Sequence, residues 1–324
     1  MSKTELCSEL AELISDYRRG EVTGIDSRHV DTWISQFPAG VQEPLLREVN
    51  HVLNQTYIQK KKVDRFLRKL VSNSDFAGSN PLQFWQGVKF LSLQKVGHSQ
   101  KDMLALFDRC LREELDISIA DCGKNPHTYV YLDDAVFSGG RVKSDLSRWI
   151  SEEAPRNANV AIIVMAVHAL GEYFSTGDIN KAAKEAGKSI QLRFWRAITL
   201  ENRKAYRENS DVLWPRSIPA EAEAYVAALG ATPILRTANG IGSLKLFSSP
   251  EARELLEQEF LKAGLTVRNR CKLLPPHMRP LGSTLMRTPG FGSMFITHRN
   301  CANNTPLVLW AGDPWYPLFP RKTN

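Results

Sequence analysis

Two adjacent carboxylates, Asp133 and Asp134, directly follow a short apolar stretch at residues 129–132. The stretch is rich in aromatic and β-branched residues and lies between Pro126 and a glycine pair, a pattern that predicts a buried parallel strand. Open α/β sheets bind their ligands at the carboxyl ends of their strands. The two acids are therefore placed to contact a polar ligand.

A small-residue turn, Ser138-Gly139-Gly140, leads from the acids into a helical pattern over residues 142–150. Unpaired backbone N–H groups at a helix N-terminus bind phosphate. Glycines allow the backbone to approach closely, and Ser138 adds a hydroxyl donor. Strand, acids and turn together predict a sugar-phosphate site. The alternative is an ordinary strand that ends in an exposed acidic turn.

These residues resemble the phosphoribosyl diphosphate (PRPP) loop of type I phosphoribosyltransferases, in which two acids follow an apolar strand and precede small and hydroxyl-bearing residues. Two positions depart, since Phe137 and Arg141 stand where that family has Thr or Ser. The departures remove two hydroxyl donors, while Arg141 supplies a guanidinium that can pair with phosphate. The resemblance implies that the acids bind the ribose hydroxyls. It also implies that the 5′-phosphate is held by Ser138, Gly139, Gly140 and Arg141.

A second loop of the same kind lies upstream. Residues 88–93 form an apolar run, and residues 103–111 carry apolar side chains at helical spacing, with Ser99 as the expected N-cap. The resemblance places the pyrophosphate loop here, one strand-and-helix unit before the acid pair. It implies contacts to the leaving group from Lys95, Gly97, His98 and Ser99. The alternative is a solvated surface turn, which is the commoner place for a Lys and a His.

Residues 281–321 combine Gly, Asn, Pro and Trp with alternating apolar residues, whereas a disordered terminus lacks large aromatics. They resemble the C-terminal signature of PRTase-CE, a phosphoribosyltransferase-like family associated with bacterial conflict and antiviral defence systems. Ala302 departs, because that signature has Pro there. The matching segments are residues 290–293, 300–305, 309–310 and 315–321. The wider resemblance extends from about Trp85 to the end of the chain.

The same tail predicts rigid packing, with a strand over residues 291–296. Its tryptophans and prolines either complete the core as an aromatic lid or stack on a planar ligand. Asn300, Asn303 and Asn304 are candidate contacts to a base or a ribose, although clustered amides more commonly cap turns and helices.

The composition agrees with an anionic ligand. The 324 residues carry a net charge of +7 and 43% hydrophobic residues, enough for one large core or two modest ones. The basic residues are spread along the chain, so nucleic-acid binding is not indicated. The five cysteines form no metal-binding or redox pair, and neither a signal peptide nor a membrane-length apolar run is seen. We therefore expect a reduced, cytoplasmic protein that contacts no membrane.

The predicted fold is a type I phosphoribosyltransferase-like α/β core with an N-terminal helical cap and a C-terminal α+β extension. Residues 1–80 show helical patterns, including a long one over residues 44–71, and form the cap. Residues 81–324 form the phosphoribosyltransferase-like domain with its Gly/Asn/Trp-rich tail. In that domain helices alternate with strands at residues 88–93, 129–132, 159–169 and 190–200.

The resemblance implies substitution at the anomeric carbon of PRPP, assisted by Mg²⁺. Positive charge develops on the ribose, so the pyrophosphate must be held and the nucleophile positioned. Mg²⁺ would bridge pyrophosphate and ribose oxygens and contact Asp133 and Asp134 through waters. Transfer, hydrolysis and phosphorolysis remain open, and the acceptor is not specified. The alternative is a catalytically inactive nucleotide-binding regulator, because two hydroxyl positions of the loop are lost.

In a defence system such a protein would be a toxin-like effector that depletes or modifies a nucleotide pool. Its activity has to be held off until infection, so the resemblance implies a control partner encoded beside it, such as an ATPase or another sensor. The helical residues 1–80 are a candidate docking surface for that partner, and a plain helical cap is the alternative.

Overall fold

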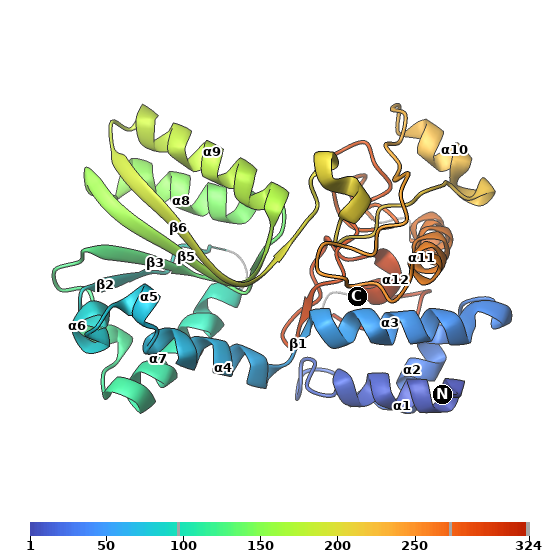
Figure 1. The fold of residues 1–324 in the computed structure, drawn as a ribbon, viewed down its shortest axis with the longest axis horizontal. Coiled ribbons are helices and arrows are strands. Elements are labelled where there is room, and N and C mark those ends of the chain that lie inside the picture. Colours follow the sequence, from blue (N-terminus) through green and yellow to red (C-terminus); the bar gives the residue numbers. More distant parts are fainter. Residues whose placement is uncertain (96–97, 272–273, 322–324) are drawn as a thin grey trace. The chain divides into compact units, whose positions relative to one another are not determined.

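The computed structural model describes residues 1–95, 98–271 and 274–321. They form two compact units, and the chain leaves the first unit, forms the second and then returns (Figure 1). The first, here called the discontinuous unit, combines Met1–Lys60 with Glu201–Asn324. The second, here called the sheet unit, is Lys61–Leu200. The expected boundary near residue 80 lies within the sheet unit, where α5 (Ser74–Ala77) is followed by α6 (Pro81–Gln86).

A parallel five-stranded sheet forms the centre of the sheet unit. Its four longer strands lie side by side in the order β2 (Val88–Leu91), β3 (Thr128–Leu132), β5 (Asn157–His168) and β6 (Ser189–Leu200). The short β4 (Ala135–Val136) pairs with β5 in the register of β3, since Leu132 lies opposite Ile163 and Ala135 lies opposite Ala166. β3 and β4 therefore act as one continuous strand along β5, and only the two acids separate them. The predicted α/β class with a parallel sheet is confirmed.

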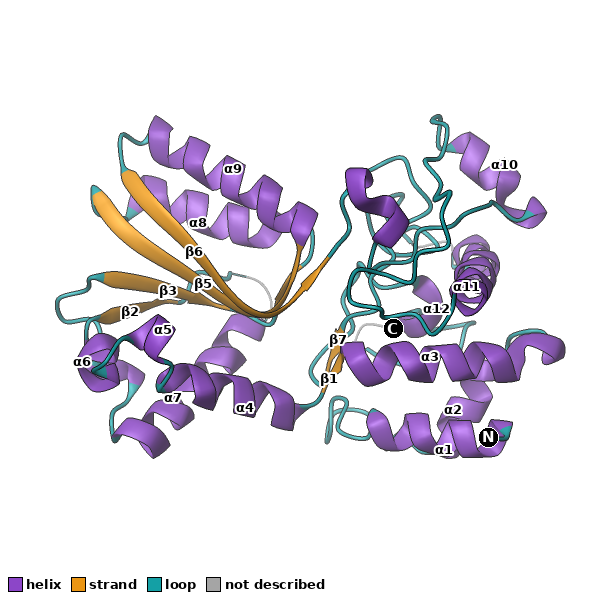
Figure 2. Ribbon diagram, in the orientation of Figure 1, coloured by secondary structure: helices purple, strands orange, loops and turns teal. Residues whose placement is uncertain are grey.

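Helices cover both faces of this sheet (Figure 2). One face carries α8 (Gly140–Glu152) and α9 (Ala169–Glu185). The other carries α4 (Lys60–Val71), α5, α6 and α7 (Ser99–Leu115). Alternate strand residues reach the first layer, where Tyr131 and Ile162 are buried in one core with Trp149 and Ile150 of α8. The period of two in the strands and the helical spacing in α8 bury their apolar residues in the same place.

A cluster of aromatic side chains packs between the sheet and the helices α4, α6 and α7. Trp85 of α6 stacks on Phe90 of β2 and meets Phe107 of α7 at a steep angle, with ring centroids 6.0 and 4.9 Å away. Its indole N–H donates to the carbonyl of Val71 at the end of α4. Because the ring is buried and its polar atom is satisfied, Trp85 fixes α4, α6 and α7 against β2.

Helices are the main regular elements of the discontinuous unit, and a short parallel ladder joins its two chain segments. In this ladder β1 (Tyr57–Ile58) pairs with β7 (Ile296–Thr297). The helices are α1 (Lys3–Leu13), α2 (Ser27–Ile34), α3 (Gln42–Thr56), α10 (Ala220–Ala228), α11 (Pro250–Arg270) and α12 (Leu307–Trp310). Single 3-10 segments occur at Ala39–Val41 and Lys204–Asn209, and in the sheet unit at Ile119–Asp121. No helix in the described part of the chain combines the length and the apolar character that crossing a membrane requires.

Two elements differ from the sequence prediction. The single helix over residues 44–71 is wrong, because β1 separates α3 from α4. Tyr57 is aromatic and Ile58 is β-branched, and their pairing with β7 replaces the helical hydrogen bonds. The strand over residues 291–296 is wrong for most of its length, since the ladder begins only at Ile296. Gly292 has φ of 71° and its carbonyl accepts from the N–H of Leu213, so the chain turns there.

The C-terminal tail completes the core of the discontinuous unit. Trp310, Trp315 and Phe319 are buried. The two indole N–H groups donate to the carbonyls of Thr305 and Val308 at 2.9 and 2.8 Å. The tail is thus an aromatic lid over its own unit, the first of the two interpretations drawn from the sequence.

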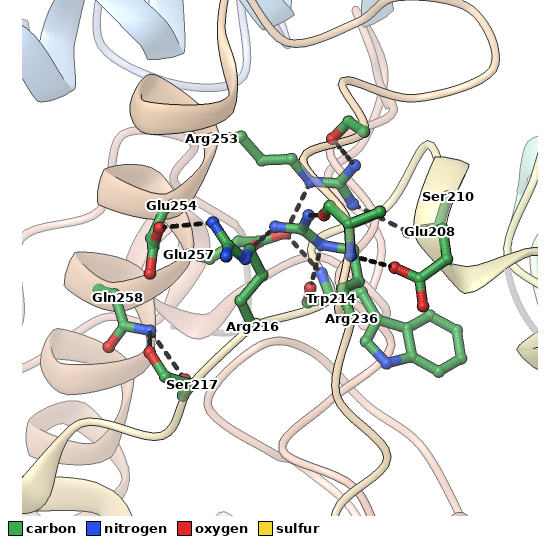
Figure 3. A network of polar contacts seen from close by, with 12 residues as sticks. Glu208, Ser210, Trp214, Arg216, Ser217, Arg236, Arg253, Glu254, Glu257 and Gln258 are labelled. Carbon is green, nitrogen blue, oxygen red and sulfur yellow. Dashed lines mark hydrogen bonds and ion pairs between the residues drawn. The ribbon is translucent and has the colours of Figure 1, made fainter.

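A buried ion-pair cluster, here called the Glu257 cluster, holds the loop before α11 (Figure 3). Glu257 accepts hydrogen bonds from Arg253 Nε at 2.8 Å, Arg236 Nη2 at 2.6 Å and the backbone N–H of Trp214 at 2.9 Å. The remaining guanidinium donors bind Ser210 Oγ and the carbonyls of Val212, Trp214, Ala238 and Gly240. Residues 229–249 lie outside helices and strands, so these side chains supply partners that a regular ladder would otherwise provide.

Candidate ligand site at the carboxyl end of the sheet

The acid pair lies at the carboxyl end of β3, as its place in the sequence predicts. Pairing with β5 continues through it, because Asp133 N donates to Ile163 O and Met165 N donates to Asp134 O, both at 3.0 Å. Asp133 is 5% exposed, and its Oδ1 accepts from the N–H of Asp134 at 2.9 Å. Asp134 is half-buried and is the more accessible carboxylate of the two.

Two glutamines connect the upstream loop to Asp133. Gln94 Nε2 donates to Asp133 Oδ2 at 2.6 Å, while Gln94 Oε1 accepts from Ser99 Oγ and from the N–H of Gln100. The buried Gln100 in turn accepts, through Oε1, from the N–H groups of Leu93 and Gln94. The loop after β2 and the acid pair therefore form one hydrogen-bonded assembly. Sequence reasoning singled out neither glutamine.

A buried tyrosine and a helix complete this assembly. Tyr131 OH donates to Asp145 Oδ2 of α8 at 2.9 Å. Arg148 donates to Leu93 O at 2.6 Å and lies 3.7 Å from Asp145. Burial, helped by the charge of Asp133, raises the pKa of Tyr131 above its usual range. The hydroxyl therefore remains a donor across the working pH range of most proteins.

The glycine turn between β4 and α8 packs closely on α9. Gly139 has φ of 78°, and a Cβ on it would lie 2.5 Å from Gly171 O. A Cβ on Gly171 would lie 2.1 Å from Phe137 O, so this contact requires both glycines. Ser138 Oγ accepts from the N–H of Gly140 at 3.4 Å, and Gly139, as N-cap residue, offers α8 no side-chain cap. Such a helix start suits an anion.

Arg141 is exposed in the first turn of α8. A cation at a helix N-terminus opposes the helix dipole, so the position is unfavourable unless an anion is bound nearby. Within the described ranges no carboxylate forms an ion pair with it. The structure therefore leaves this guanidinium available to a phosphate.

Replacement of Arg141 tests that role. Arg141→Ala should weaken binding of a 5′-phosphorylated ligand by about 1.5–3 kcal/mol, the range for a charged hydrogen bond, and should affect the unphosphorylated nucleoside little. Isothermal titration calorimetry with both ligands measures the difference. Lys184→Ala, which removes an exposed cation from the last turn of α9, is the matched control. Equal losses for nucleotide and nucleoside would remove Arg141 from the phosphate site.

The remaining candidates of the upstream loop are only partly described. Lys95 and His98 are exposed and Ser99 is half-buried, while Gly97 lies outside the described residues. The expectation that Ser99 caps α7 is wrong, because His98 is the N-cap residue and Ser99 Oγ donates to Gln94 instead. Contacts of this loop with pyrophosphate stay a prediction.

The three tail asparagines belong to the discontinuous unit. Asn304 Nδ2 donates to Ser283 O at 2.9 Å, and Asn303 Oδ1 accepts from Arg321 Nη1 at 2.7 Å. Asn300 is exposed, and its backbone N–H donates to Thr297 O. Two of the amides thus form hydrogen bonds within the tail, and a contact to a base or ribose stays a prediction.

His168 ends β5 beside the glycine turn, 5.3 Å from the Phe137 ring, and is fully buried. Burial lowers its pKa from 6.5 to about 3, so the folded protein keeps it neutral. The unfolded chain binds the proton first, and the free energy of unfolding therefore falls as pH drops below 6.5. Between pH 6.5 and 5 His168 should account for about 2 kcal/mol of loss. Urea titrations at both pH values should show a smaller loss for His168→Gln, and an equal loss would contradict this assignment.

The acids fit a cation that keeps most of its own ligands. Among the described residues no group of three or more His, Cys, Asp or Glu side chains could enclose a metal. Mg²⁺ commonly contacts one or two carboxylates and takes its remaining ligands from water and substrate phosphates. Asp134, with Asp133 behind it, matches that requirement.

A parallel sheet with helices on both faces, an acid pair at a strand end and a glycine turn at a helix start define a phosphoribosyltransferase-like protein. The family model PRTase-CE matches residues 30–321, and the chain therefore belongs to the PRTase-CE family. Neither a curated protein nor a solved structure matches the chain. The family membership inferred from the loop and the tail is confirmed.

Proposed function

We propose that the sheet unit binds PRPP or a nucleotide, together with Mg²⁺, and acts at the anomeric carbon of the ribose. One observation carries the proposal: the acid pair at the end of β3 is followed, after two residues of β4, by an uncapped glycine turn that starts α8. Sugar hydroxyls and phosphate thus find an acceptor group and a donor group within one loop. Membership of a phosphoribosyltransferase-like family supports the same ligand class.

The proposed roles follow from exposure and hydrogen bonding. Asp134 accepts from the ribose hydroxyls, and the buried Asp133 adds negative charge close to the ring as positive charge develops there. Ser138 and the first N–H groups of α8 hold the 5′-phosphate, and Arg141 neutralises it. Gln94 fixes the carboxylate of Asp133 and so acts as a positioning residue.

The leaving group is assigned to the loop that precedes α7. Lys95 and His98 are exposed there and supply donors to a pyrophosphate. Asp134 and Asp133 would hold Mg²⁺, which would neutralise charge on the phosphate oxygens. Since Gln94 joins this loop to the acid pair, ligand contacts on either side affect the same hydrogen-bond assembly.

A nucleotide-binding regulator without catalysis is the second candidate. It is favoured by Phe137, which brings no hydroxyl to the loop, and by the state of Asp133, whose two oxygens already accept hydrogen bonds within the protein. Such a protein would bind the same ligand and would not turn it over.

The resemblance of the tail to the PRTase-CE signature also supports a proposal about the role of the protein in the cell. We assign the chain to an antiphage defence system, as an effector that changes a nucleotide or PRPP pool and is controlled by a protein encoded beside it, an ATPase or another sensor. Control is needed because PRPP and nucleotides are common metabolites, and unrestrained turnover would harm the host cell.

The experiment that separates the two candidates is direct. The purified chain is incubated with PRPP and Mg²⁺, with and without bases or nucleotides, and pyrophosphate release is followed while products are identified by mass spectrometry. Release that depends on Mg²⁺ supports catalysis. Binding by calorimetry without any product supports the regulator, and absence of both binding and product refutes the ligand class.

A further inference from the structure

A hollow of about 310 Å³ opens at the amino ends of the strands, on the sheet face that α5 and α6 cover. Its walls come from α5 and α6 and its floor from β3, β5 and β6, all within the sheet unit. The side chains used below are Phe76, Phe84, Thr128, Asn159, Gln191 and Arg193.

Polar side chains form a row across the floor of the hollow. Thr128 lies opposite Asn159 on the neighbouring strand, and Asn159 lies opposite Gln191 on the next. The following row of the same face places Ala161 beside Arg193. Because Ala161 carries a single methyl group, the middle of the floor stays open.

This polar row is unusual for a parallel sheet, whose faces are commonly apolar and covered. The alternation itself is regular, since Val160 and Leu192 pack into the core on the α8 and α9 side. Asn159 and Gln191 are exposed, and Asn159 Nδ2 donates to His127 O at 3.3 Å. Within the described ranges the Gln191 amide has no hydrogen-bond partner. The floor therefore presents both donors and acceptors.

The walls add the half-buried ring of Phe84, backed by the buried ring of Phe76, and one fixed charge. The rings of Phe76 and Phe84 lie 5.5 Å apart at 75°. Arg193 donates to Asp75 O at 2.9 Å, and its guanidinium carbon lies 5.4 Å from the Phe76 ring and 5.3 Å from the Trp195 ring. Among the described lining residues it is the single charged side chain. The guanidinium is thus held in place at the hollow by three contacts.

We propose that this hollow binds a nucleobase-bearing ligand of the size of a nucleoside monophosphate. Its volume is at the small end of the roughly 300–1,000 Å³ found for ligand pockets and is enough to hold a mononucleotide. Aromatic side chains stack on bases, and the amides of Asn and Gln pair with base edges through a donor and an acceptor together. Arg193 is placed to pair with a phosphate.

The hollow is distinct from the acid pair. Thr128 precedes Asp133 by five residues along the same strand, which is roughly 16 Å at the rise of a β-strand. One site lies at the amino ends of the strands and the other at their carboxyl ends. The inference therefore stands independently of the proposed phosphoribosyltransferase-like chemistry.

Calorimetric titration of the full chain with AMP, GMP, CMP and UMP tests the proposal. At least one of them should bind, and Asn159→Leu and Gln191→Leu should each weaken that binding about tenfold or more. Both substitutions are at exposed positions, so circular dichroism should show an unchanged fold. Asn180→Leu, at an exposed asparagine of α9, is the matched control and should leave the affinity unchanged.

The acid-pair variant Asp133→Asn with Asp134→Asn separates the two sites, and it should retain binding at the hollow. Loss of binding in that variant, with normal affinity in Asn159→Leu, would place the nucleotide at the carboxyl end and overturn the proposal. Two other results would also overturn it: no nucleotide binding at millimolar concentration, or a dimer in light scattering that Asn159→Leu dissociates while nucleotide affinity is unchanged.

Discussion

Asp133→Asn combined with Asp134→Asn should lower the affinity for PRPP and Mg²⁺ about 100-fold or more. Each carboxylate that binds a hydroxyl or a metal-bound water contributes a charged hydrogen bond of about 1.5–3 kcal/mol. The loss of both bonds therefore lowers the binding affinity by more than about 100-fold. The fold should survive. An asparagine at position 133 has one acceptor oxygen and one NH2 group, so it can accept only one of the two hydrogen bonds that Asp133 accepts from Gln94 Nε2 and from the backbone N–H of position 134. The loss of the other bond should cost about 1 kcal/mol of stability.

Calorimetry with PRPP and a urea titration on the same samples measure both effects. Gln83→Leu, at an exposed amide of α6 on the other side of the sheet unit, is a control that should bind PRPP normally. The same double variant, expressed with its neighbouring genes and challenged with phage, should neither protect cells nor shift nucleotide pools. Equal PRPP affinity in wild type and variant would refute the role of the acid pair, whatever the outcome in cells.

The local parts of this site could be predicted from the sequence because they depend on neighbours in the chain. The apolar run before Asp133, the small residues after it and the helical spacing from Val142 specify strand, turn and helix in order. The start of α2 is specified just as locally, since the Asp26 side chain accepts from the N–H of His29.

Contacts between segments that are distant in the sequence could not be predicted as well. The Gln94 side chain meets Asp133 across 39 positions of sequence, and no spacing rule connects an amide after one strand with an acid after the next. An amide that follows a strand directly and precedes a candidate loop is the sequence feature that could have drawn attention to it. The helix expected over residues 44–71 failed in the same way, because the partner that turns Tyr57 into a strand residue lies at Ile296.

The discontinuous unit depends most strongly on contacts that the sequence does not reveal. Its two segments are separated by the whole sheet unit, and no local pattern in the sequence indicates that residues before Lys60 pack with residues after Glu201. The tail was a candidate for ligand contacts because it is rich in Trp and Asn, yet its indoles bind carbonyls of the same tail. Aromatic composition indicates rigid packing, and only the fold decides whether the partner is protein or ligand.

The Glu257 cluster yields the largest expected effect on stability. Glu257, Arg253 and Arg236 have side chains with 0–1% exposure, and the single carboxylate lies between two guanidinium groups (Figure 3). Glu257→Ala would leave both cations buried without their counterion, and removing one partner of a buried ion pair costs about 3–5 kcal/mol. The variant would also remove the acceptor of the Trp214 N–H.

A neighbouring ion pair on the same helix provides the matched comparison. Glu254 pairs with Arg216 at 3.4 Å, but both side chains are about one-third exposed. Solvent screens that pair, so Glu254→Ala should cost no more than about 1 kcal/mol. Urea unfolding of the two variants, followed by tryptophan fluorescence, measures the contrast. Near-equal losses would mean that the arginines find other partners when Glu257 is absent, because a buried guanidinium without an acceptor cannot be tolerated at so small a cost.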